Sequence, residues 1–168
     1  MERKTIRKWW WVWQFEQEEQ WLNTMAQEGW ALCGVGFCTY HFERCEPGEY
    51  TVRLEMHGKD KGYLRFMEEL GAEFVGSYAQ WLYFRRKTVD GPFDIFSDID
   101  SRITHLDQIG KTLSVIGVCN LIIGLANTIN PMLNIGWINL LCATLVMYCV
   151  GRIHGKKESL EKERMLRE

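Results

Sequence analysis

The stretch "GWALCGVGFCTYHFER", residues 29–44, is followed by a second stretch with the same physical pattern, "GAEFVGSYAQWLYFRR", residues 71–86. In both, a glycine precedes an apolar segment, further glycine interrupts it, and an aromatic segment ends in arginine. A shift of 42 positions, 71 minus 29, superposes the two stretches without a gap. We therefore predict that this part of the chain contains one structural module twice.

The apolar periodicity of the first unit, residues 8–46, changes from that of a strand to that of a helix and back. Residues 8–14 alternate as in a strand, and the helical stripe that follows ends at Gly29, a residue type suited to a left-handed helix stop. The second unit, residues 50–87, repeats this order. Each unit is therefore predicted to be a β-α-β-β module.

One such module cannot cover both faces of its own sheet, whereas two modules side by side can. We predict an α+β fold in which the duplicated modules of residues 8–87 form one mainly antiparallel sheet of about six strands. Both helices are expected on one face of that sheet.

The composition limits the function classes. With 168 residues, 46% of them apolar, the chain has room for one domain and appendages. A formal net charge of -2 without a concentrated basic segment argues against a nucleic-acid partner. The six cysteines contain no C-x-x-C pair and the N-terminus has no secretory apolar region, so we expect reduced thiols and no structural zinc.

The C-terminal third contains two uncharged apolar runs, residues 112–130 and 132–150, separated by Pro131. Each run is long enough to cross about 30 Å of hydrocarbon as a helix. We predict a transmembrane helical hairpin over residues 111–151. The alternative, a buried soluble hairpin, is less favoured because the rest of the chain is too small to cover it.

Basic residues flank the hairpin on one side only. Arg102 and Lys111 precede it, Arg152, Lys156 and Lys157 follow it, and the connection between the spans has no basic residue. Positively charged flanks stay in the cytoplasm, so we expect a two-span protein of the cell membrane with both termini cytoplasmic.

Two segments complete the predicted organisation. Residues 88–110 are expected to form a linker and an amphipathic juxtamembrane helix, and residues 152–168 a charged cytoplasmic tail near the lipid headgroups. In the linker, Asp98 and Asp100 form an Asp-x-Asp pair of the kind that begins some metal sites. Ser97 followed by Asp100 fits a helix N-cap better, so we prefer that interpretation.

The sheet face away from the helices is predicted to be aromatic and charged, because an even shift preserves strand parity. Phe42, Val52, Leu54, Leu82 and Phe84 are assigned to the helix face. The opposite face is then expected to carry Trp11, Trp13, His41, Glu43, Arg53, Glu55, Trp81, Tyr83 and Arg85.

We interpret this face as a ligand platform. Its aromatic rings would stack on a flat or cationic amphipathic molecule, and Glu43 and Glu55 would balance the charge. Three alternatives remain open, since tryptophans are also interface residues: the face packs on a second subunit, on residues 91–110 or on the lipid surface. The run Trp9–Trp11 with Trp13 has the further interpretation of a membrane-interface belt, which we rank lower.

The four histidines lie in four separate segments, so no metal cluster or catalytic triad follows from their spacing. We predict no catalytic residues, no metal ion and no cofactor. The leading functional hypothesis is a membrane-anchored cytoplasmic sensor or adaptor that binds a small ligand. The alternative is a membrane-tethered protein-interaction module that acts on a partner regulator or forms a homodimer.

In outline, residues 8–87 resemble the duplicated modules of the GyrI-like class, a resemblance that rests on element order and implies a small-molecule ligand in the groove between the halves. A closer resemblance rests on "FEQEEQWLNTMAQEGWAL" (15–32), "FERCEPGEYTVRLEM" (42–56), "GAEFVGSY" (71–78) and "DGPFDIFSDIDSRITHL" (90–106), followed by paired apolar spans. These stretches are similar to a bacterial family of membrane proteins, the domain of unknown function 2812 family. The resemblance implies a signalling or stress setting, since such proteins are often encoded near PadR-like transcription regulators.

Overall fold

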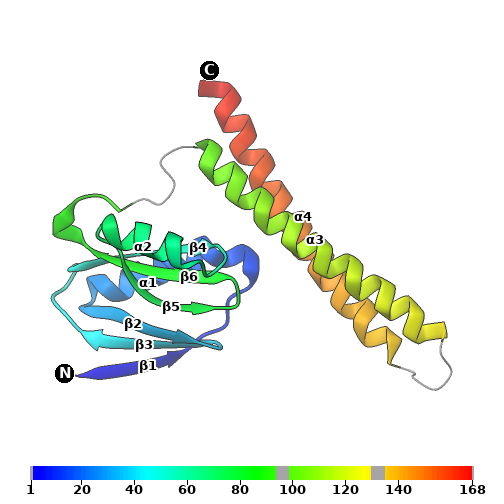
Figure 1. Ribbon diagram of the computed structural model, residues 1–168, viewed down its shortest axis with the longest axis horizontal. Helices are drawn as coiled ribbons and strands as arrows, with labels where there is room; N and C mark the ends of the chain where they lie inside the picture. The colour runs from blue at the N-terminus through cyan, green and yellow to red at the C-terminus, as the bar shows by residue number, and fades with distance from the viewer. Residues whose placement is uncertain (1, 94–98, 130–134, 168) are drawn as a thin grey trace. The chain divides into compact units, whose positions relative to one another are not determined.

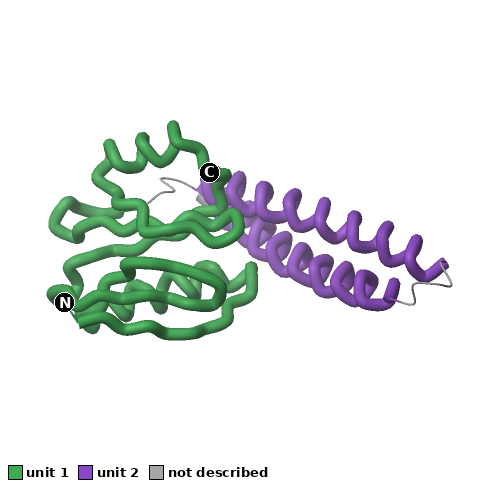
Figure 2. The backbone as a smooth tube through the Cα atoms, turned by 60° about the horizontal axis from the view of Figure 1, so that its bottom comes forward, with its two compact units in different colours: residues 1–95 green, residues 96–168 purple. Residues whose placement is uncertain are grey.

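The computed structural model describes residues 2–93, 99–129 and 135–167. The chain divides into two compact units, Met1–Ile95 and Phe96–Glu168, and each is considered by itself (Figure 2). The first unit contains two three-stranded antiparallel sheets with helices, and the second is a two-helix apolar hairpin. The predicted α+β class is confirmed.

The first module has the predicted element order (Figure 1). Its elements are β1 (Arg3–Arg7), η1 (Val12–Gln14), α1 (Phe15–Gln27), β2 (Trp30–Gly36) and β3 (Thr39–Arg44). The strands pair antiparallel in the order β1-β3-β2. Gly29 has φ +83° directly after α1, a conformation in which a side chain would be strained, and a Cβ there would lie 3.0 Å from the Cys45 carbonyl oxygen.

The second module repeats the first. Its elements are β4 (Tyr50–Met56), α2 (Lys61–Glu69), β5 (Glu73–Tyr78) and β6 (Trp81–Lys87), followed by η2 (Thr88–Asp90). The strand order β4-β6-β5 matches that of the first sheet. Each sheet has a register shift at the same place, between Leu32 and Gly34 in β2 and between Phe74 and Gly76 in β5. This repetition of a bulge at the 42-residue offset supports an internal duplication.

The predicted strand at residues 8–14 is wrong, because the first strand is β1, Arg3–Arg7. The ladders show which residues of the two first strands are equivalent. Arg3 of β1 pairs with Glu43 of β3, and Val52 of β4 pairs with Arg85 of β6. Arg85 and Glu43 differ by 42 positions, but Val52 and Arg3 differ by 49. The first module therefore contains seven additional residues after its first strand. A basic, solvated edge strand carries little apolar signal, whereas the tryptophan-rich connection imitates a strand.

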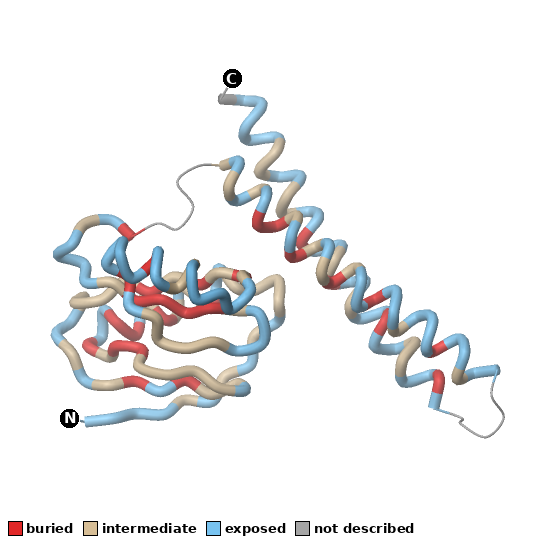
Figure 3. Tube along the Cα trace, viewed as in Figure 1, coloured by how far each residue is buried: buried red, intermediate tan, exposed pale blue. Residues whose placement is uncertain are grey.

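The strands form two sheets, which corrects the prediction of one continuous sheet. Side chains of α1 and of both sheets share one core, formed by Leu22, Met25, Leu32, Tyr40, Phe42, Val52, Leu54 and Tyr83. On the other side of the second sheet, Met67 of α2 packs with Leu82 and Phe84. The second sheet is thus covered on both faces. Many of the buried residues of the first unit lie in this sheet (Figure 3).

The predicted face assignment fails in the second sheet. Val52 lies opposite Arg85 and Leu54 opposite Tyr83, so these side chains share one face. Phe84 lies on the other face, opposite Arg53. When a strand is apolar on both faces, the alternation of its residues does not show which face packs against the helix.

Side chains of α1 complete the free edge of β4. The Val52 N–H donates to Asn23 Oδ1 at 2.8 Å, and Asn23 Nδ2 donates to the Val52 carbonyl oxygen at 3.0 Å. The Leu54 N–H donates to Glu19 Oε2 at 3.0 Å. These groups replace a neighbouring strand, so the edge is protected from further pairing.

The second unit consists of α3 (Ile99–Ile129) and α4 (Gly136–Arg167). The predicted juxtamembrane helix and first span are therefore one helix, as are the second span and the tail. Glycines at a seven-residue spacing on α3 face α4: Gly110 is next to Ile153, Gly117 next to Met147 and Gly124 next to Leu140. Such small residues allow close helix approach.

Both helices are long and apolar enough to cross a membrane. Only 17% and 22% of their most apolar stretches is buried, whereas the core helices of soluble proteins are mostly buried. Exposed residues run along both helices (Figure 3), and several of them, such as Ile122 and Leu141, are large and apolar. The predicted cap residue Ser97 and the acidic Asp94 and Asp98 lie outside the described residues.

Candidate functional site

A hollow of about 420 Å³ lies on the face of the first sheet that points away from α1. It is lined by Arg3, Lys4, Thr5, Cys33, Gly34, His41, Phe42, Glu43 and Arg85. Three of the nine predicted site residues, His41, Glu43 and Arg85, therefore come together there. The other six lie elsewhere, so the prediction of one shared platform is wrong in its geometry.

Strand register builds the floor of this hollow. Arg3 of β1 lies opposite Glu43 of β3, and Thr5 lies opposite His41, which in turn faces Gly34 of β2. Thr5 Oγ1 and His41 Nδ1 are 3.0 Å apart and share a hydrogen bond. A Cβ added at Gly34 would lie 3.4 Å from His41 Cδ2, so the absence of a side chain there keeps the hollow open.

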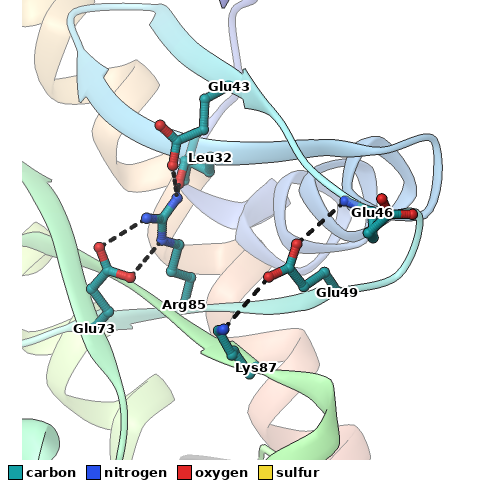
Figure 4. Close-up of polar contacts among 7 residues, drawn as sticks. All are labelled: Leu32, Glu43, Glu46, Glu49, Glu73, Arg85 and Lys87. Atoms are coloured by element: carbon teal, nitrogen blue, oxygen red, sulfur yellow. Dashed lines mark hydrogen bonds and ion pairs between the residues drawn. The ribbon is translucent and has the colours of Figure 1, made fainter. Parts of the chain in front are cut away.

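Arg85 lines one side of the hollow. Its Nε and Nη2 donate to the two Glu73 oxygens at 2.8 and 2.9 Å, and its Nη1 donates to Glu43 at 2.8 Å and to the Leu32 carbonyl at 3.0 Å (Figure 4). Burial lowers the pKa of Arg85, but the hydrogen bonds and charges of Glu73 and Glu43 outweigh it and raise the pKa above its usual value. The guanidinium is permanently charged and holds Glu43 at the hollow's edge.

Tyr83 is buried and belongs to the core rather than to a ligand surface. Its hydroxyl and that of Tyr40 each donate to Glu18 Oε1 at 2.7 Å. Burial raises the pKa of Glu18, although the two hydrogen bonds lower it in part. The sequence prediction assigned Tyr83 to an open face because only the tertiary contact with α1 reveals its partner.

Arg53 and Glu55 lie on the α2 face of the second sheet, opposite Phe84 and Leu82 in the ladder. Arg53 pairs with Glu19 at 3.0 Å, and Glu55 accepts a hydrogen bond from the Tyr63 hydroxyl. Neither side chain lines the hollow on the first sheet. They were assigned to the open face because the prediction placed the helix on the wrong side of the strand.

The predicted tryptophans lie in a different part of unit 1. Trp11 stacks on Trp13 with ring centroids 5.1 Å apart, and its other neighbour is Trp9 at 5.6 Å. Trp81 stacks on Phe15 at 5.3 Å. These rings are therefore not available to a ligand bound beside Glu43.

Trp9 continues this row of rings to the β2–β3 turn and to the end of β5. Its ring lies 6.2 Å from Phe37 in the β2–β3 turn, and Phe37 lies 5.7 Å from Tyr78 at the end of β5. We call Trp9, Trp11, Trp13, Phe37 and Tyr78 the aromatic surface. The sequence analysis did not single out Phe37 and Tyr78, although a large apolar residue in a hairpin turn is itself a signal, because turns are normally polar.

The described residues contain no group of three or more His, Cys, Asp or Glu side chains that could hold a metal ion. Burial, followed by the nearby Glu43 carboxylate, raises the pKa of the Cys33 thiol at the hollow. Cys33 is therefore protonated and weakly nucleophilic at neutral pH.

Comparison with known proteins identifies the family. A family model described as a protein of unknown function (DUF2812) matches residues 14–118, well over half of the chain. The chain belongs to the DUF2812 family. The DUF2812 match begins at the last residue of η1 and includes both α1 and the second module. Neither the curated proteins nor the solved structures contain a match, so the likeness to GyrI-like modules stays a prediction.

Proposed function

We propose that this DUF2812 protein is a membrane-anchored sensor or adaptor that binds a small polar ligand with a cationic group in the hollow on the first sheet. The helices α3 and α4 are the anchor, and both termini lie in the cytoplasm. The anchor is supported by the length and exposed apolar surface of the two helices. Its orientation is supported by the basic residues at the open end of the hairpin.

The observation that carries the ligand proposal is the pairing of opposite charges around a concave surface. Arg3 and Glu43 face each other across the ladder, and the hollow's volume, about 420 Å³, falls within the usual range for small-molecule pockets. Glu43 Oε1 already accepts from Arg85, so Glu43 offers its other oxygen to a cationic group, and Arg3 offers donors to an acidic or polar group. A zwitterion or a small amine with a polar tail fits both.

The aromatic part of the predicted ligand class loses its support. Trp11, Trp13 and Trp81 stack on other rings and do not line the hollow. The ligand class is therefore defined by charge and hydrogen bonding, not by ring stacking.

The proposal is tested with the full chain in detergent micelles, using choline, putrescine and glycine betaine as probes. A saturable rise in the melting temperature of unit 1 is expected with at least one probe, because a ligand that binds only the native state stabilises it. Glu43→Gln removes the carboxylate charge, and Gly34→Leu fills the hollow without changing any charge. Both variants should lose the response.

Glu28→Gln is the matched control, because Glu28 is exposed and does not line the hollow. It should respond like the wild type. Unchanged melting of a folded wild-type protein with all three probes would contradict the ligand proposal. A response that persists in Gly34→Leu would place the ligand elsewhere.

The alternative function, a membrane-tethered protein-interaction module, is favoured by a separate observation. The aromatic surface exposes large rings, with Phe37 66% and Trp9 56% accessible. Exposed aromatic clusters of this kind mark interaction surfaces in soluble domains.

A further inference from the structure

The aromatic surface is a continuous row of rings built from three separate segments. Stacked, edge or tilted contacts with 5.1–6.2 Å between ring centroids connect Trp13, Trp11, Trp9, Phe37 and Tyr78 in that order. The Lys8 N–H donates to the Cys38 carbonyl at 3.0 Å and ties the tryptophan segment to the β2–β3 turn. Four of these rings are at least 40% exposed.

Most of this surface belongs to the seven additional residues of the first module. The second module connects its strand to its helix through residues 57–60 and contains no tryptophan there. Since the second module forms the same fold without such a segment, the core does not require the exposed rings of Trp9 and Trp11. Exposed aromatic rings that the core does not need indicate a contact outside the domain.

The charged residues within the segments that carry the rings have one sign. These segments, residues 7–15, 35–40 and 75–84, contain Arg7 and Lys8 and no acidic residue, although the chain has 22 Asp and Glu residues. Arg7 is exposed, whereas the Lys8 ammonium lies over the core-packed rings of Trp10 and Trp21, 4.3 and 4.5 Å from their centroids. Aromatic segments with an exposed arginine and without acidic residues complement an anionic lipid headgroup region.

We propose that the aromatic surface inserts into the headgroup region of a bilayer containing anionic lipid, so that the chain contacts the membrane through unit 1 as well as through its helices. Tryptophan and tyrosine rings partition to that depth because one part of the ring is apolar and another is a hydrogen-bond donor. The inference rests on the proposed membrane anchor. That anchor makes the second contact intramolecular, so modest affinity is sufficient.

The test uses the full chain reconstituted into vesicles of phosphatidylcholine, with or without phosphatidylglycerol, whose acyl chains are brominated near the headgroup. The fluorescence difference between the wild type and a Trp9→Phe/Trp11→Phe double variant isolates the emission of these two rings. We expect bromine to quench at least half of this difference in the anionic vesicles. Addition of about 0.5 M salt should weaken the quenching, because it screens Arg7 and Lys8.

Four further variants separate the outcomes. The difference signal of Trp137→Phe, at the start of α4, reports hairpin insertion, and that of Trp30→Phe, at the opposite end of β2 from Phe37, should stay unquenched. Phe37→Glu places a charge in the aromatic surface and should abolish quenching of Trp9 and Trp11. Val89→Glu, at an 87% exposed position outside that surface, should not.

Quenching of Trp137 without quenching of Trp9 and Trp11 in any lipid would overturn this inference and leave the anchor intact. If those two rings instead change emission with protein density in the bilayer and ignore bromine, the surface binds a second copy of the chain, which also overturns it. An unquenched Trp137 would contradict the anchor itself.

Discussion

The two sheets of unit 1 have the same strand order and the same bulge, yet they have opposite environments. The second sheet is buried on both faces, between α2 and the core that it shares with α1. The first sheet has α1 on one face and a solvent-accessible hollow on the other. Tyr83, buried in the second sheet, corresponds at the 42-residue offset to His41, which is exposed at the hollow.

This difference teaches where function can reside in a repeated fold. Positions equivalent in sequence serve packing in one module and face solvent in the other. Glu43 and Arg85 are themselves equivalent positions and form an ion pair at 2.8 Å, so the contact joins the two modules. The module with the open face keeps a solvent-accessible hollow.

The largest effect is expected from Arg85→Met, which removes the ion pair and the hydrogen bond that connect the two sheets. The change leaves Glu43 without its cation and the Leu32 carbonyl without its donor, at a cost of about 3 kcal/mol in the free energy of unfolding. Chemical denaturation of the full chain in micelles, followed by near-ultraviolet circular dichroism, measures this loss.

Arg53→Met is the matched control, because Arg53 pairs with a single carboxylate and its side chain is 28% exposed. It should cost less than about 1 kcal/mol. Equal losses for the two variants would show that Arg85 is no more important than an ordinary peripheral ion pair.

An intermediate effect is expected from adding a methyl group at the equivalent glycines of the two sheets. A Cβ at Gly76 would lie 3.0 Å from Val35 Cγ2, whereas a Cβ at Gly34 would lie 3.4 Å from the nearest side-chain atom. Gly76→Ala should therefore cost about 2 kcal/mol through overpacking, and Gly34→Ala should be close to neutral. Parallel thermal melts of the two variants compare them directly, and a neutral Gly76→Ala would contradict the close approach of β2 and β5.

The smallest effect concerns the pH dependence of the shared core. Burial raises the pKa of Glu18 in the folded state above its unfolded value, so the folded state binds this proton more tightly. Its contribution to stability therefore rises as the pH falls through the raised pKa and is lost above it. Glu18→Gln keeps an acceptor for Tyr40 and Tyr83 without the charge.

We expect Glu18→Gln to melt at a higher temperature than the wild type at pH 7 and at a similar one near pH 4. Thermal melts across this range measure the difference. A variant that is less stable than the wild type at neutral pH would show that the ionised carboxylate strengthens the core.

The amount that could be predicted differs between the parts of the chain. The 42-residue offset correctly located α1, β2 and β3 against α2, β5 and β6, because glycine stops and apolar periodicity are local signals. The first strand was misplaced because Arg3–Arg7 is a charged edge strand whose pairing with β3 leaves no apolar pattern. His41, Glu43 and Arg85 line one hollow, whereas the other residues assigned to the same face lie elsewhere, and the role of all nine stays a prediction.

The sequence by itself determined the order of helices and strands, the repeated module and the apolar helical pair, since each depends on residues close together in the chain. Only the tertiary structure decided that the strands form two sheets, that α1 completes the edge of β4 and that Tyr83 meets Glu18. It also brought Trp9, Phe37 and Tyr78 into one surface. The reason is that alternation along a strand shows which side chains share a face but not what covers that face, because its covering comes from distant segments.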